Sequence, residues 1–144
     1  MSFSADLRTF FLNIPAISAQ IGTRLFPYVI DQSAVGIYPS AIYQLSLPIP
    51  SKDISVVNQK HWETDLVIAV SARDTATQSG HDVALGVCGL FKDAIDCYIG
   101  QIGNWHIKWV KFDHGHMEYE AEPTTYVQVA AFTIYTLEQP NFLT

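Results

Sequence analysis

Charge is scarce in this chain, and positive charge is the scarcest. Lys, Arg, Asp and Glu together make up 15% of the 144 residues, and eight Lys and Arg stand against 14 Asp and Glu, for a net charge of −6. A protein that grips nucleic-acid phosphates needs clustered basic residues, but here they are spread from Arg8 to Lys111. The composition therefore argues against tight nucleic-acid binding, while DNA could still pass close by without sticking.

Cysteine is also rare, and long apolar runs are missing. Cys88 and Cys97 lie in a stretch predicted to be helical, about 13 Å apart along the helix axis, so they cannot bridge each other. The sequence shows no N-terminal secretion signal and no apolar run of about 20 residues. We therefore expect a protein made and kept in the cytosol, with no contact to a membrane.

Apolar residues, in contrast, are abundant. Hydrophobic residues make up 49% of the chain, including 8 Phe, 7 Tyr and 3 Trp. A length of 144 residues suits one domain with a real core. So apolar and weakly charged a composition predicts a single domain, 1–144, with some apolar surface buried against other subunits.

The central stretch from Trp62 to Ile99 predicts a strand followed by a long helix. Apolar and polar residues alternate from Trp62 to Val70, and a helical period follows from Thr77 to Ile99. At about 100° per residue, one stripe of that helix is apolar and should lie on a sheet. The stripe consists of Val83, Val87, Leu90, Phe91, Ala94 and Tyr98.

Shorter elements flank this centre. A first helix is expected over Ala5–Asn13 with Ser4 as its N-cap, and a short helical turn over Ala16–Ile21 that ends at Gly22. Strands are expected at about 24–29, 41–47, 105–112 and 125–137. Together these elements predict an α+β fold with one mixed, mainly antiparallel sheet, an N-terminal helix and one long central helix.

The last predicted strand has apolar side chains on both faces, so it should be central in the sheet or covered on its second face by another subunit.

Two connections stand out by their polarity. Residues 48–61 form an arm or loop insertion between two strands, and the acidic segment Asp113–Pro123 is expected to be a turn between the last two strands.

Histidine provides the main candidate for chemistry. The run Asp113-His114-Gly115-His116, with His106 nearby, offers ligands of a kind that zinc accepts, but its spacing matches no site template and a solvated turn is the more common outcome. A small metal-binding or hydrolase domain using His106, His114 and His116 is therefore kept as an alternative. Cys88 lies next to the apolar stripe, as a small core residue does.

Two glycines in the middle of the central helix suggest a different kind of site. Gly86 and Gly89 fall on the face away from the apolar stripe, with Leu85 near them. Each costs about 1 kcal/mol relative to Ala in a helix. One interpretation is that a well-packed helix tolerates them, and the other is that a neighbouring subunit packs closely on this face.

The order of these segments resembles the tail-terminator (tail-completion) proteins of long-tailed bacteriophages and of the phage-derived particles related to them. The resemblance covers the chain from the opening helix to the last strand, and it depends on order and spacing rather than on one motif. The matching segments are Asp6–Arg8, "IPAISAQIGTRLFP" (Ile14–Pro27), "YPSAIYQ" (Tyr38–Gln44), "TDLVIAVSA" (Thr64–Ala72), and "TTYVQVAAFTIYTL" (Thr124–Leu137).

The resemblance implies a structural virion protein without catalytic residues or cofactor. Such proteins form a ring, commonly of six copies, on the head-proximal end of the tail tube, stop tube polymerisation and dock the head connector. The chain would then be made in the bacterial cytoplasm and reside at the tail–head junction of the virion. Another head–tail adaptor, such as a stopper or neck protein, is the alternative within this class.

Three sets of residues become candidate contacts under this hypothesis. Leu85, Gly86 and Gly89 are expected at the subunit interface. The carboxylates of the acidic turn (Asp113, Glu118, Glu120 and Glu122) are expected to line the channel, where they would let DNA pass without binding it. The insertion is longer than the family pattern and inherits no role, but Lys52, Asp53 and Lys60 are candidate contacts of an interaction arm.

Overall fold

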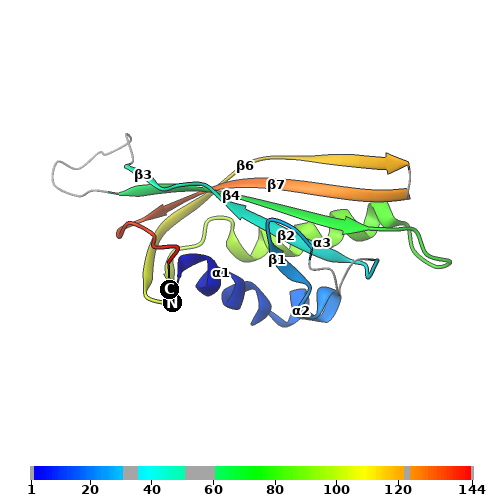
Figure 1. The fold of residues 1–144 in the computed structure, drawn as a ribbon, viewed down its shortest axis with the longest axis horizontal. Coiled ribbons are helices and arrows are strands. Elements are labelled where there is room, and N and C mark those ends of the chain that lie inside the picture. Colours follow the sequence, from blue (N-terminus) through cyan, green and yellow to red (C-terminus); the bar gives the residue numbers. More distant parts are fainter. Residues whose placement is uncertain (1, 31–35, 51–60, 122–123, 144) are drawn as a thin grey trace.

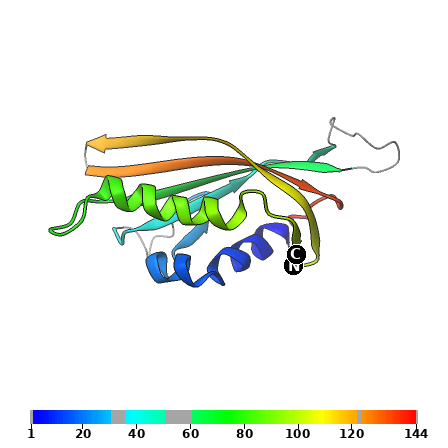
Figure 2. The same cartoon turned by 180° about the vertical axis from the view of Figure 1, so that it is seen from behind.

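The described residues form two layers, a sheet and a set of helices that all lie against one face of it (Figure 1). The computed structural model describes residues 2–30, 36–50, 61–121 and 124–143. The reverse view shows the same arrangement, with the opposite face of the sheet free of helices (Figure 2). We call this uncovered side the outer face.

The sheet of the described chain has seven strands, and its hydrogen-bonded order is β1-β2-β4-β7-β6-β5, with β3 beside the start of β4. Strands β1 and β2 are parallel and the remaining pairs are antiparallel. This confirms the predicted α+β fold with a mixed, mainly antiparallel sheet. The strands are β1 (Leu25–Pro27), β2 (Ser40–Leu45), β3 (Ile49–Pro50), β4 (Trp62–Ala72), β5 (Gly100–Ile102), β6 (Trp105–Ala121) and β7 (Thr124–Thr136).

The first two helices are α1 (Phe3–Leu12) and α2 (Pro15–Ile21). Helix α1 begins earlier than expected, because the hydroxyl of Ser2, not of Ser4, accepts the backbone N–H of Ala5 at 3.1 Å. This places Phe3 inside the helix and in the core, where it is fully buried. Helix α2 ends at Gly22 as predicted, and the positive φ of 61° at this residue is one that glycine adopts readily.

Helix α3 (Gly80–Ile95) is shorter than the predicted Thr77–Ile99. Its N-cap is Ser79, and the carboxylate of Asp74 accepts the backbone N–H of Gly80 at 2.7 Å, so the turn before it is fixed by side chains. Val87 and Phe91 of the predicted stripe are buried as expected. Three residues of α3 beside the predicted stripe are also buried: Ala84, Cys88 and Ile95. They are buried because the helix packs on β4 and β7 and also contacts α2.

The core lies between the helices and the inner face of the sheet. Aromatic rings join the helices there: the rings of Phe11 and Phe91 meet edge to face with centroids 5.0 Å apart. From the sheet, Leu66, Phe132 and Phe112 form one row across β4, β7 and β6. Strand β7 therefore lies between β4 and β6, which confirms that the last strand is central in the sheet.

The expected acidic turn at Asp113–Pro123 is wrong. Residues up to Ala121 belong to β6, which pairs with β7 from Ile107 to Ala121, and residues 122–123 lie outside the described chain. Beyond the short β5, strand β6 has no second neighbour among the described strands. Its polar residues can face solvent from both sides of an edge strand, so their polarity, which had suggested a turn, is compatible with a strand.

The insertion at 48–61 is described only at its two ends. Ile49 and Pro50 of β3 pair with Glu63 and Trp62 at the start of β4. The charged residues Lys52, Asp53 and Lys60 lie outside the described residues. Strand β3 and the start of β4 therefore lie at the end of the sheet opposite the end of β6 and the start of β7 (Figure 1).

Candidate functional site

The exposed face of α3 carries the first candidate surface. Leu85 is 49% exposed, and Gly86 is exposed beside it. A Cβ built on Gly86 or Gly89 would meet nothing within 4 Å, whereas a Cβ on Gly80 would lie 2.6 Å from the backbone of Arg73. Of the three glycines in α3, Gly80 alone is therefore required by the packing of the described subunit. Gly86 and Gly89 lower the stability of the helix, although no contact within the described subunit requires glycine at either position.

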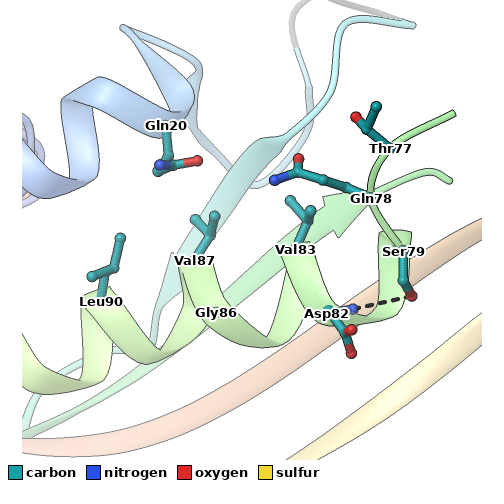
Figure 3. Close-up of a pocket in the computed structure, with 9 residues that line it drawn as sticks. All are labelled: Gln20, Thr77, Gln78, Ser79, Asp82, Val83, Gly86, Val87 and Leu90. Atoms are coloured by element: carbon teal, nitrogen blue, oxygen red, sulfur yellow. Dashed lines mark hydrogen bonds between the residues drawn. The ribbon is translucent and has the colours of Figure 1, made fainter. Parts of the chain in front are cut away.

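Two hollows border this face of α3. The larger, of about 450 Å³, lies between α3, α2 and the turn before α3, and Gly86 forms part of its floor beside Val83, Val87 and Leu90 (Figure 3). The smaller, of about 190 Å³, lies on the other flank, where Leu85 and Gly89 approach Phe112 of β6. A protein that packed on Leu85, Gly86 and Gly89 would therefore find a recess on each side of the contact.

Residues of a hydrolase triad occur near the first hollow, but their bonds are structural. Ser79 uses its hydroxyl to accept the backbone N–H of Asp82 at 3.5 Å, which caps α3 (Figure 3). The imidazole of His81 bonds instead to the carboxylate of Asp82, at 3.0 Å, and its ring lies edge-on to Tyr126. No bond between Ser79 and His81 is among those of the described residues, so the geometry of a nucleophile and its base is not built here.

The outer face of the sheet is the second candidate surface. Cross-strand pairing puts Val67, Ala131 and His114 in one row, and Ala69, Val129 and His116 in the next. The aliphatic members of both rows are half-buried although no described helix covers them. Apolar side chains on an uncovered sheet face are typical of a surface that meets another protein.

A hollow of about 520 Å³ opens on this face, and we call it the outer-face hollow. Val67, Val129 and Ala131 line it, with Asp65, Asp113, His114 and His116 around them. The register of β6 against β7 shifts between Phe112 and His114, so Asp113 is the extra residue of a bulge. Its carboxylate accepts the hydroxyl of Thr133 at 2.7 Å and lies 4.0 Å from the ammonium of Lys111.

The remaining acidic candidates lie farther toward the end of β6. Glu118 is exposed and its carboxylate lies 3.0 Å from Nε2 of His116. Glu120 is exposed and pairs with Thr125 across the strands, which puts it on the same face as Glu118. Glu122 lies outside the described residues. Three of the four residues assigned to an acidic turn therefore share one strand instead.

The three histidines of the alternative hypothesis are not brought together. His114 and His116 stack with ring centroids 6.5 Å apart, but His106 lies at the other end of β6 and bonds to Glu138. Burial raises the pKa of the Glu138 carboxyl, but the backbone N–H and the imidazole of His106 outweigh this and hold the pKa below its ordinary value. The described residues hold no cluster of three or more His, Cys, Asp or Glu that could bind a metal ion.

Cysteine chemistry is disfavoured at the core position. Cys88 is 3% exposed, and burial raises the pKa of its thiol to about 11. Because the thiolate is the reactive form, Cys88 is a structural residue, as its place beside the apolar stripe predicted. Cys97 is exposed, and neither cysteine forms a disulfide.

Sequence reasoning missed the edge position of β6 and the outer-face hollow. The alternation of Met117 and Tyr119 with charged residues was the available signal for a strand, and it was outweighed by the density of charge. The bulge at Asp113 left no signal, because it shifts the register without changing the composition. Among the described residues no helix is long and apolar enough to cross a membrane.

Comparison with known proteins finds similarity in structure alone. No protein-family model matches the sequence, and no curated protein matches it either. A solved structure described as the virion of a native gene transfer agent (GTA) particle contains a chain of similar fold, with a TM-score of 0.67 and 12% sequence identity. The similarity covers 95% of this chain and 96% of that chain, so the whole two-layer architecture is shared with a subunit found in that virion.

Proposed function

We propose that this chain is a structural protein of a phage-like virion, and that it forms a ring, of six copies, on the head-proximal end of the tail tube. The observation that carries the proposal is the similarity of fold, over nearly all of both chains, to a subunit of a gene transfer agent virion. In this role the ring ends tube polymerisation and offers a docking surface to the head connector.

Two uncovered surfaces support assembly with other copies. Leu85, Gly86 and Gly89 would lie at the contact between neighbouring subunits, since small residues let another backbone approach closely. The outer face of the sheet supplies a second apolar surface, away from α3. A ring needs two different surfaces on each subunit, each facing a different neighbour, and this subunit offers them.

The acidic residues near the end of β6 suit a channel for DNA. Glu118 and Glu120, with Glu122, would face the lumen and repel phosphates, so that DNA crosses the ring without being held. Asp113 is a weaker candidate for this role, because its carboxylate is engaged with Thr133 and Lys111. The function is structural, and no catalytic group or cofactor is assigned to it.

The test combines mass and position. Native mass spectrometry of the purified protein should give six times the 16.1 kDa subunit mass, and antibody labelling of particles should mark the junction of tail and head. Particles made without the protein should carry tails of uncontrolled length. Labelling of tailless heads would favour a head-side adaptor or stopper instead, and one tightly bound metal ion per chain would favour the metal-binding alternative.

A further inference from the structure

The outer-face hollow has the features of a docking site for an extended segment. Its apolar lining, Val67, Val129 and Ala131, is half-buried within the subunit, so a segment with aliphatic side chains would complete its burial. The hollow runs across three adjacent strands, β4, β7 and β6. Such a surface takes side chains that project from one side of an extended chain.

Charge on the outer face selects a basic occupant. Asp65 and Asp113 border the hollow. Lys111, whose ammonium lies 4.0 Å from Asp113, is the basic residue that pairing places beside them. Apart from the histidines, carboxylates therefore outnumber cations on this part of the described sheet. A partner with lysines at the ends of an apolar run would complement them.

The chain itself contains one segment of this kind. Residues 51–60 have the sequence SKDISVVNQK, in which Lys52 and Lys60 flank a β-branched run that includes Ile54, Val56 and Val57. With two Lys and one Asp, Asp53, the segment has a net charge of +1. The other basic side chains are mostly engaged within the described fold. Arg8 and Arg24 donate to backbone carbonyls, Arg73 stacks on the ring of Tyr38, and Lys92 pairs with Asp96.

The connection of this segment favours a neighbouring copy over its own subunit. Pro50 pairs with Trp62, and Ile49 with Glu63, so the chain leaves β3 and enters β4 on the side of Trp62 that points away from Asp65. The described chain therefore points away from its own outer-face hollow on both sides of residues 51–60, and this favours the outer face of an adjacent subunit as their docking site.

We propose that residues 51–60 of one copy dock in the outer-face hollow of the next copy, with Lys52 or Lys60 against Asp65 and the β-branched residues on Val67 and Val129. This inference rests on the proposed ring. The contact joins two different surfaces of identical chains, and repeated contacts of that type close into a ring when the rotation between subunits allows it.

Charge reversal tests the contact on the full chain. Asp65→Lys should weaken association of the subunits about tenfold or more, and so should the double change Lys52→Asp with Lys60→Asp, because each brings like charges together. Combining all three changes should restore association to within a few fold of wild type. Sedimentation velocity over a range of concentrations measures this, and circular dichroism checks that each variant is folded. Glu120→Lys, the same reversal on the same face but beyond the hollow, is the matched control and should leave association unchanged.

Disulfide trapping identifies the occupant. In a Cys97→Ser background, copies carrying Asp65→Cys are mixed with copies carrying Lys52→Cys or Lys60→Cys and oxidised; buried Cys88 stays unreactive. A disulfide between the two kinds of copy supports the proposal. A disulfide that forms only within one chain carrying both cysteines would overturn the proposal. Charge-reversal variants that associate like wild type would also overturn it, and so would a combined variant that fails to restore association. If one of these results is found while the wild-type protein still forms hexamers, only the docking proposal is contradicted. If the wild-type chain never forms rings, alone or on tail tubes, the proposed function itself is contradicted.

Discussion

The carboxylate of Asp6 accepts a hydrogen bond from the indole Nε1 of Trp105 at 2.9 Å, joining residues 99 positions apart. The bond ties the first turn of α1 to the start of β6, and Gly103 completes the contact, since a Cβ there would lie 2.4 Å from Asp6. A charged acceptor makes this a stronger bond than most. It fixes the N-terminal helix to the edge of the sheet.

Loss of this bond should destabilise the subunit. We expect Asp6→Ala to lower the free energy of unfolding by about 1.5 to 3 kcal/mol, because the indole N–H loses a charged partner. Urea denaturation of the unassembled chain measures the change. Asp96→Ala, which removes a surface pair with Lys92 and a weak hydrogen bond from the thiol of Cys97, is the control and should cost less than about 1 kcal/mol. Equal losses in the two variants would contradict the importance of the Asp6–Trp105 bond.

Phe91 should be indispensable to the fold. Its side chain is fully buried and its ring contacts Phe11, so Phe91→Asp places an unpaired carboxylate between the helices. The cost of several kcal/mol is comparable to the whole stability of a domain, about 5 to 15 kcal/mol. Circular dichroism should show an unfolded chain. Leu85→Asp, on the exposed face of the same helix, should remain folded, and a Phe91→Asp variant that melts like wild type would show that the helix is wrongly placed.

The glycines of α3 should respond in opposite directions in the free and the assembled protein. Gly86→Ala and Gly89→Ala should each raise the stability of the isolated subunit by about 0.5 to 1 kcal/mol, because the new methyl group meets nothing within 4 Å. Gly89→Leu should leave the subunit folded but weaken ring formation.

Thermal melting and ring mass test these glycine variants together. Gly80→Ala is the control that should destabilise the subunit, since its Cβ would lie 2.6 Å from the Arg73 backbone. If Gly89→Leu rings keep their mass and tails keep their length, this face of α3 does not meet a neighbour.

Acid should weaken the contact between His106 and Glu138. The pKa of Glu138 is lower in the folded chain than its ordinary value of 4.5, so the contact stabilises the fold above that pH and the contribution is lost as the pH falls through the lowered value. Glu138→Gln should therefore be less stable than wild type near neutral pH, and the difference should shrink as the pH falls below 4.5. Denaturation midpoints across this range provide the measurement, and a difference that stays constant with pH would contradict the assignment.

Charge in the proposed channel should control the passage of DNA. Replacing Glu118, Glu120 and Glu122 with Lys should leave rings and tails intact but slow DNA ejection, because lysines hold phosphates where carboxylates repelled them. The effect should be strongest at low salt, where screening is weakest. Ejection followed by release of a DNA-binding dye would reveal it. Unchanged kinetics at low salt would place this part of β6 outside the channel.

The sequence predicted the elements of this fold better than their roles in it. Alternation from Trp62 and the helical period around Phe91 located β4 and α3, because both bury one regular face. The boundaries shifted where side chains compete for the backbone, as with Ser2 at α1 and Asp74 before α3. Local caps of this kind depend on three-dimensional contacts that the pattern does not contain.

The candidate site was predictable only in part. Leu85 and Gly86 of α3 are exposed and Gly89 is half-buried, and the helical wheel predicted that they lie away from the apolar stripe without any knowledge of distant residues. The acidic segment was wrongly predicted to be a turn, because charged and polar residues are favoured both in an exposed turn and on an exposed edge strand. The outer-face hollow joins residues of β4, β6 and β7, and no local pattern could have shown that Asp65 and His116 line one hollow.

The order of the strands also governs how this chain reaches its folded state. Strands β6 and β7 are neighbours in sequence and can pair early. Strand β4 pairs with β7, with Trp62 opposite Thr136, and this can happen only after α3, β5 and β6 have been synthesised. Closing so long a loop is slow, and refolding on a scale of roughly milliseconds to seconds is typical of sheets built this way. During synthesis the centre of the sheet therefore stays open until β7 has left the ribosome, and a subunit becomes competent to assemble only after that moment.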